Sequence, residues 1–105
     1  MQELRTREET ERALAGTGVI FKHSTRCPVS YDVHDEVERF AAAHPEVVVW
    51  KVDVVASRPL SQQIAHATGV THQSPQVLVI EDGRVVWHAS HYAVTTAAIE
   101  RHLGA

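Results

Sequence analysis

The residues best suited to carry out chemistry lie in one short run of the chain. Its one cysteine, Cys27, is preceded by Arg26 and followed by Pro28, a residue type that suits the first position of a helix. Partnerless N–H groups and the positive end of the helix dipole stabilise a thiolate at such a helix start, and the charge of Arg26 acts in the same direction. We therefore predict that Cys27 is a catalytic thiol, although most free cysteines are small buried hydrophobes.

A serine occupies the third position after the cysteine. In dithiol redox enzymes that position carries a resolving cysteine, whereas Ser30 offers a hydroxyl that can hydrogen-bond a thiolate but cannot form a disulfide with it. Cys27 can then attack a mixed disulfide between a protein and a small thiol, and take the small thiol onto itself. Because no internal thiol can release it, a second low-molecular-weight thiol must resolve the adduct. We predict thiolate-stabilising roles for Arg26, Pro28 and Ser30.

A second constellation precedes an apolar run. Ser74-Pro75 is either an ordinary trans proline that begins a strand or a cis proline. A cis bond would turn the backbone of Ser74 toward Cys27, where its N–H and C=O can pair with an extended ligand or client backbone. The residues that we predict to bind the small thiol or the client protein are Thr25, His72, Gln73, Ser74 and Pro75.

Three further residues are weaker candidates for the same site. His23 can raise the thiolate fraction or receive a proton, but a surface or turn histidine is an equally good interpretation. Lys22 is unusual in a strand that should be buried, so we expect it to snorkel or to point into the site. His91 follows the last strand and is expected at the same end of the sheet. No His, Cys, Asp and Glu group has metal-site spacing, so we expect no metal.

Helical and strand patterns alternate along the chain and position these residues. The patterns predict helices over Arg5–Ala15, Pro28–Ala43, Arg58–Thr68 and Ala93–Leu103, and strands over Val19–His23, Val47–Asp53, Gln76–Ile80 and Val85–Ala89. The β-branched run that ends at Asp53 predicts a strand buried on both faces. Asp82-Gly83 is a strong hairpin signal.

This order predicts an α/β, thioredoxin-like fold. Two βα units, an antiparallel hairpin and a helix make a four-stranded mixed sheet flanked by helices, with an extra short N-terminal helix. A cysteine at the start of the helix after the first predicted strand, and a proline at the start of the third, complete the thioredoxin arrangement.

Composition bounds the remaining interpretations. A length of 105 residues indicates a single domain over 1–105, with 1–17 as an N-terminal helical extension. A formal net charge of −3 and the lack of a basic block argue against nucleic acid. The apolar runs are too short for a membrane span or a signal peptide, and a lone cysteine favours a reducing cytoplasm.

At this point the motifs resemble a known family. The runs Ile20 to Ser30, Ser74 to Gln76 (with His72 before it) and Trp87 to His91 are similar to the monothiol bacilliredoxins of the C type. Those are small bacterial thioredoxin-fold proteins that use bacillithiol in place of glutathione. The resemblance covers the chain from 18 to 103. The chain departs from it at Gln73, where related sequences often carry an acidic residue.

The resemblance implies a function and its partners. It implies that Cys27 removes bacillithiol from bacillithiolated client proteins, and that Pro75 is cis. Bacillithiol is then a co-substrate and no cofactor is bound, while a flavin-dependent bacillithiol-disulfide reductase acts indirectly to complete the cycle.

Two alternatives from other classes stay open. One is a glutaredoxin-like module that binds or delivers an iron–sulfur cluster through Cys27, which needs a bridging dimer because one cysteine cannot hold a cluster. The other is a non-catalytic thioredoxin-like adaptor, whose thiol would react no faster than a free model thiol.

Overall fold

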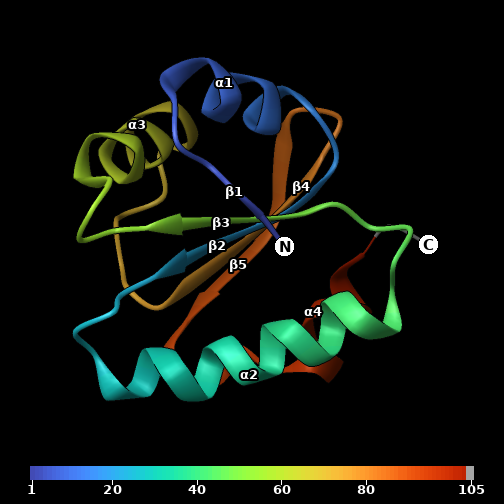
Figure 1. Cartoon of the computed structure of the whole chain (residues 1–105). Coiled ribbons are helices and arrows are strands. Elements are labelled where there is room, and N and C mark those ends of the chain that lie inside the picture. Colours follow the sequence, from blue (N-terminus) through green and yellow to red (C-terminus); the bar gives the residue numbers. More distant parts are fainter. Residues whose placement is uncertain (104–105) are drawn as a thin grey trace.

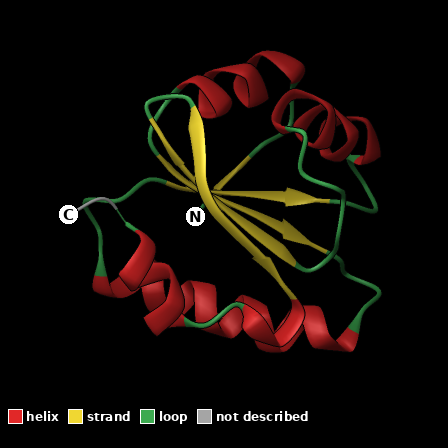
Figure 2. Ribbon diagram, turned by 180° about the vertical axis from the view of Figure 1, so that it is seen from behind, coloured by secondary structure: helices red, strands yellow, loops and turns green. Residues whose placement is uncertain are grey.

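A central mixed sheet separates two layers of helices in the computed structural model, which describes residues 1–103 (Figure 1). α1 and α3 cover one face of the sheet, and α2 and α4 cover the other (Figure 2). The elements in chain order are β1 (Gln2–Glu3), α1 (Arg7–Ala15), β2 (Gly18–His23), α2 (Pro28–Ala43), β3 (Val49–Asp53), α3 (Arg58–Thr68), β4 (Gln76–Glu81), β5 (Arg84–Ser90), the 3₁₀ turn η1 (His91–Ala93) and α4 (Thr96–His102).

The sheet has the order β1-β3-β2-β4-β5, with β2 parallel to β3 and antiparallel to β4. The α/β fold class is confirmed, but the prediction of four strands is wrong because β1 adds a fifth. β1 pairs Gln2 with Trp50 and Glu3 with Lys51. Its two residues are polar and exposed, so no apolar pattern indicates a strand there.

Central β2 places consecutive side chains in different environments. All six of its residues are buried because it has a strand on each side and a helical layer on each face. Phe21 packs in the core cluster on the α2 face, and Ile20 packs with residues of α3 in the other cluster. Since strand side chains alternate between faces, Lys22 projects toward α3 and His23 toward α2.

Two predicted boundaries on the N-terminal side are corrected by local chemistry. α1 begins at Arg7 because Thr6 and Glu9 form a capping box, in which each side chain accepts a hydrogen bond from the other's backbone. β3 begins at Val49, and the expectation that it is buried on both faces is wrong. Trp50, Lys51 and Asp53 are only partly buried.

The C-terminal elements also differ in their ends. The hairpin strands extend up to the Asp82-Gly83 turn, whose φ angles of 50° and 80° are the positive values that a tight hairpin requires. The last helix begins at Thr96, because the Thr95 side chain accepts from the N–H of Ala98 as an N-cap. No helix among the described residues is long and apolar enough to cross a membrane.

Candidate active site

Cys27 lies where β2 gives way to α2, as the N-cap residue of a sixteen-residue helix with Pro28 in its first turn. The residue is partly exposed. Its N–H donates to the Ser24 carbonyl at 3.3 Å, and its own carbonyl accepts from the Ser30 N–H at 3.0 Å. Backbone bonds on both sides therefore hold the cysteine at the helix start, while Arg26 beside it is exposed.

Ser30 is fully buried and is bonded away from the sulfur. Its Oγ accepts from the Ser24 N–H at 2.9 Å and lies 2.8 Å from His23 Nδ1. Burial lowers the pKa of His23, as does the nearby His34, so the ring is neutral at pH 7, and its Nδ1 shares a hydrogen bond with the Ser30 hydroxyl. The hydroxyl at the resolving position thus ties the active-site loop to β2, and its predicted role toward a thiolate stays a prediction.

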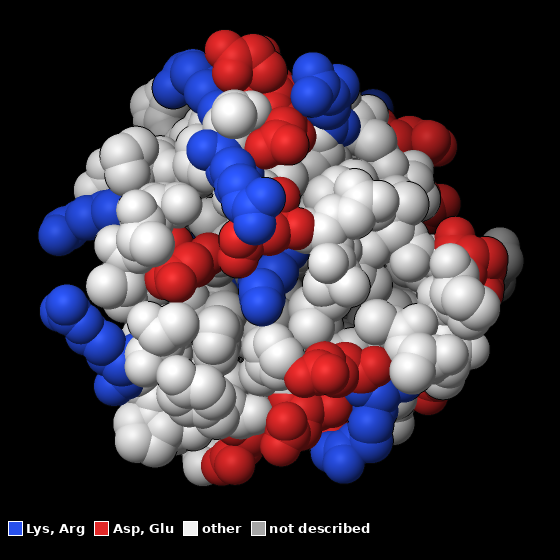
Figure 3. Space-filling view, viewed as in Figure 1, with Lys and Arg blue, Asp and Glu red and all other residues white. Residues whose placement is uncertain are grey.

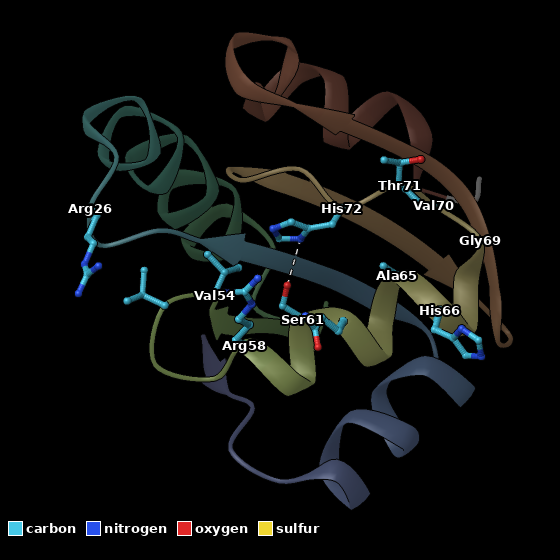
Figure 4. A pocket seen from close by; sticks show the side chains of 12 residues that line it. Arg26, Val54, Arg58, Ser61, Ala65, His66, Gly69, Val70, Thr71 and His72 are labelled. Carbon is cyan, nitrogen blue, oxygen red and sulfur yellow. Dashed lines mark hydrogen bonds between the residues drawn. The ribbon is translucent and has the colours of Figure 1, made fainter.

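Lys22 lies on the opposite face and is also fully buried, so its side chain has no surface exit. Its Nζ is 3.2 Å from His72 Nδ1, and the Ser61 hydroxyl is 3.0 Å from the same nitrogen (Figure 4). Burial lowers the pKa of Lys22 to about 8, so it is charged at pH 7 and can only donate. His72 Nδ1 is then the acceptor, and the ring proton is on Nε2.

The proline turn lies next to the end of β2. The Ser74–Pro75 peptide is cis, as the resemblance implies. Because Lys22 pairs with Gln76 in the sheet, this turn sits beside the strand end that leads to Cys27. The carbonyl of Pro75 accepts from the N–H of His91 at 3.0 Å, which brings His91 to the turn.

The two residues before this turn's proline differ in their surroundings. Gln73 is exposed, and its N–H donates to the side-chain oxygen of Gln76 at 3.4 Å. The Ser74 hydroxyl is buried and has no hydrogen-bond partner among the described residues. Their predicted role in binding a ligand or client stays a prediction.

Two exposed tyrosines, Tyr31 and Tyr92, make hydrogen bonds near the cysteine loop, and no prediction from the sequence included Tyr31. The Tyr31 hydroxyl donates to the carbonyl of Thr25 at 3.0 Å. The Tyr92 hydroxyl donates to Asp32 at 3.1 Å, and this bond raises the pKa of Tyr92. Tyr31 is four residues after the cysteine on a predicted helix, and that one-turn spacing was the available signal.

Ser61 was missed as well. It is buried on α3 in helical spacing with the core residue Ile64, so a polar residue on an apolar helix face was the signal. The structure also brings His34, Asp35 and Glu38 together, with possible ligand atoms within 4.8 Å of one another, a grouping that the sequence reasoning overlooked. His34 Nδ1 lies 2.7 Å from Glu38 Oε1, which is a salt bridge along a helix surface and by itself defines no metal centre.

The fold and the helix-start cysteine define the class as thioredoxin-fold thiol–disulfide redox proteins. A solved structure provisionally described as an oxidoreductase with a thioredoxin fold is similar with a TM-score of 0.88 and 25% identity, covering 96% of this chain and 91% of that one. Thioredoxin from Malassezia sympodialis is similar in fold with a TM-score of 0.76 and 21% identity, covering 99% and 91%. Thioredoxin from Trypanosoma brucei brucei has a TM-score of 0.75 and 16% identity, covering 96% and 85%.

The particular family follows from a sequence match. The family model for the monothiol bacilliredoxin BrxC matches residues 2–99, which is nearly the whole chain. The chain therefore belongs to the monothiol bacilliredoxin BrxC family.

Proposed function

We propose that this protein removes bacillithiol from mixed disulfides on client proteins through Cys27, and that a second low-molecular-weight thiol resolves the adduct. The observation that carries the proposal is the pairing of a partly exposed cysteine at the start of α2 with a serine at the resolving position. Membership of the monothiol bacilliredoxin family supports the choice of bacillithiol.

The proposed cycle consists of two thiol–disulfide exchanges. The Cys27 thiolate attacks the bacillithiol sulfur of the mixed disulfide; that S–S bond breaks, and the client leaves as a thiolate that takes a proton from solvent. A second bacillithiol thiolate then attacks the adduct on Cys27 and leaves as bacillithiol disulfide. The cysteine is restored as a thiolate, and the net exchange converts one mixed disulfide and one bacillithiol thiol into a client thiol and one bacillithiol disulfide.

The chain's own residues contribute position and charge to these steps. The backbone bonds of Cys27 and the buried Ser30 hydroxyl keep the sulfur at the helix start, where the helix dipole stabilises a thiolate. The cis proline turn beside β2 offers backbone groups for an extended ligand or client.

Mass spectrometry tests the proposal directly. Mixing the protein with bacillithiol disulfide should add one bacillithiol to Cys27, and free bacillithiol should remove it; oxidised glutathione serves as the comparison and Cys27→Ser as the control. If no adduct forms with either disulfide, the proposal is wrong. An anaerobically purified, coloured dimer would instead favour the iron–sulfur alternative, and a thiol no more reactive than a model thiol would favour the adaptor.

A second variant tests the monothiol cycle. Ser30→Cys places a thiol at the resolving position, so its adduct should discharge without added bacillithiol and leave a disulfide within the chain. If the adduct lasts as long in Ser30→Cys as in the native protein, position 30 is not the resolving position.

A further inference from the structure

A cleft beside the cysteine loop has the charge of an anion site. Its volume is about 960 Å³, and it lies between Arg26 of that loop, the start of α3 and the segment from Gly69 to His72 (Figure 4). Two arginines, Arg26 and Arg58, are among the described residues that line it, whereas none of those lining residues is an aspartate or glutamate. The cleft is therefore positive in a chain whose formal net charge is −3.

No carboxylate among residues 1–103 lies within salt-bridge distance of Arg26 or Arg58. Lys and Arg side chains project from the left edge of Figure 3, where β2 and β3 end in Figure 1. Planar guanidinium groups that are free to donate bidentate hydrogen bonds are the usual protein groups for holding a carboxylate.

A third cation, Lys22, is buried behind His72 and Ser61 in the wall of the cleft. Lys22 is fully buried, its ammonium reaches His72 Nδ1, and it has no carboxylate partner among the described residues. Burial of an unpaired charge is costly, and an anion in the adjacent cleft would offset part of that cost. Because Lys22 and Ser61 both occupy Nδ1, the Nε2–H of His72 is left to donate to such an anion.

We propose that this cleft is the subsite for the carboxylates of the low-molecular-weight thiol that Cys27 carries. The inference rests on the proposed function and adds which end of the thiol is recognised and where. With the sulfur of the thiol at Cys27, its acidic end lies across the loop at Arg26 and Arg58, and His72 donates from the far wall. A small thiol without carboxylates lacks these contacts and is bound less well.

The test compares three symmetric disulfides by the second-order rate constant for adduct formation on Cys27. Bacillithiol disulfide and glutathione disulfide carry carboxylates, and 2-hydroxyethyl disulfide is neutral. In Arg58→Ala, the ratio of the bacillithiol rate constant to the neutral one should fall about tenfold, since one charged contact is lost. Arg84→Ala, an exposed arginine of β5 that does not line the cleft, should leave this ratio unchanged.

The outcomes separate the subsite from the proposed function. If Arg58→Ala leaves the ratio unchanged while the native protein reacts with bacillithiol disulfide, the subsite is wrong and the proposed function stands. If the native protein reacts with glutathione disulfide but not with bacillithiol disulfide, the co-substrate is wrong, and the glutathione ratio decides the subsite. Reaction with the neutral disulfide alone, or with none of the three, overturns both.

Discussion

Lys22 and His23 are neighbours in β2, yet they organise two different polar clusters on opposite faces of the sheet. The His23 cluster (His23, Ser24 and Ser30) is closed: its members are buried, and the hydrogen bonds run from one member to another. The Lys22 cluster (Lys22, Ser61 and His72) is open: the lysine is buried, but His72 is exposed and lines the cleft.

The end of β2 therefore has a different role on each face of the sheet. A closed cluster in which each polar group satisfies another resists rearrangement, so the His23 cluster holds the loop of Cys27 in place. An open cluster with an uncompensated cation presents charge to whatever enters the cleft. The following substitutions compare the two clusters, in order of decreasing effect.

Ser30→Ala should have the largest effect. It leaves the buried Ser24 N–H and His23 Nδ1 without their common partner, so the free energy of unfolding should fall by about 2–3 kcal/mol. Urea denaturation at pH 7 measures the change. Ser57→Ala is the matched control, because that helix-cap serine makes no side-chain capping bond and should change stability by less than about 0.5 kcal/mol. If Ser30→Ala and Ser57→Ala lowered the free energy of unfolding equally, the hydrogen bonds of the His23 cluster would not stabilise the protein as argued.

Lys22→Met should act in the opposite direction. Replacing a buried cation by an apolar side chain of similar length should raise the free energy of unfolding by about 1–2 kcal/mol at pH 7. Burial lowers the pKa of Lys22 from 10.5 to about 8, so between these values the unfolded chain binds more protons and the native protein gains stability as pH rises. Below about pH 8 the cost of the charge is present in full.

The difference between Lys22→Met and the native protein should therefore shrink as pH rises. Urea denaturation at pH 7 and at pH 9.5 measures it. A difference that stays constant over this interval would show that Lys22 does not titrate there, and a destabilised Lys22→Met at both pH values would show that the lysine is fully compensated.

Ser61→Ala should cost less than Ser30→Ala, although both serines are buried. His72 Nδ1 keeps Lys22 as a donor, and no buried N–H depends on the Ser61 hydroxyl among the described residues. We expect the free energy of unfolding to fall by about 0.5–1 kcal/mol, measured by urea denaturation alongside Ser30→Ala. A loss as large as that of Ser30→Ala would mean that the Lys22 cluster is as closed as the His23 cluster.

The smallest expected effect is on the stability of the protein at acidic pH. Burial lowers the pKa of both His23 and His72 from 6.5, so the unfolded chain binds protons first and stability falls as pH drops below about 6.5. The measurement is the drop in the free energy of unfolding between pH 7 and pH 5. In His23→Gln this drop should be smaller than in the native protein, by less than about 1 kcal/mol. In His72→Gln the drop should change even less, because the His72 ring is exposed. A larger reduction in His72→Gln would reverse the comparison.

Much of the fold was predictable because its signals are local. The helix over 28–43 has a proline at its start and apolar residues at helical spacing, and both of its predicted ends are confirmed. β1 escaped prediction because it is two polar residues whose pairing with β3 depends on a strand about fifty residues away. A lysine such as Lys22 in an apolar strand is unusual, and the sequence shows this much. That its side chain cannot reach solvent follows only from the helices that cover both faces of the sheet.

The residue types at the candidate site are evident from the sequence alone. A single cysteine before a helix-starting proline, with serine in place of a second thiol, already rules out a disulfide between two cysteines of this sequence. The surroundings of that cysteine follow from the tertiary structure. The side chains of β2 alternate between faces, so Lys22 meets Ser61 and His72 on one side while His23 meets Ser30 on the other. These partners come from separate elements, and strand pairing and helix packing bring them together.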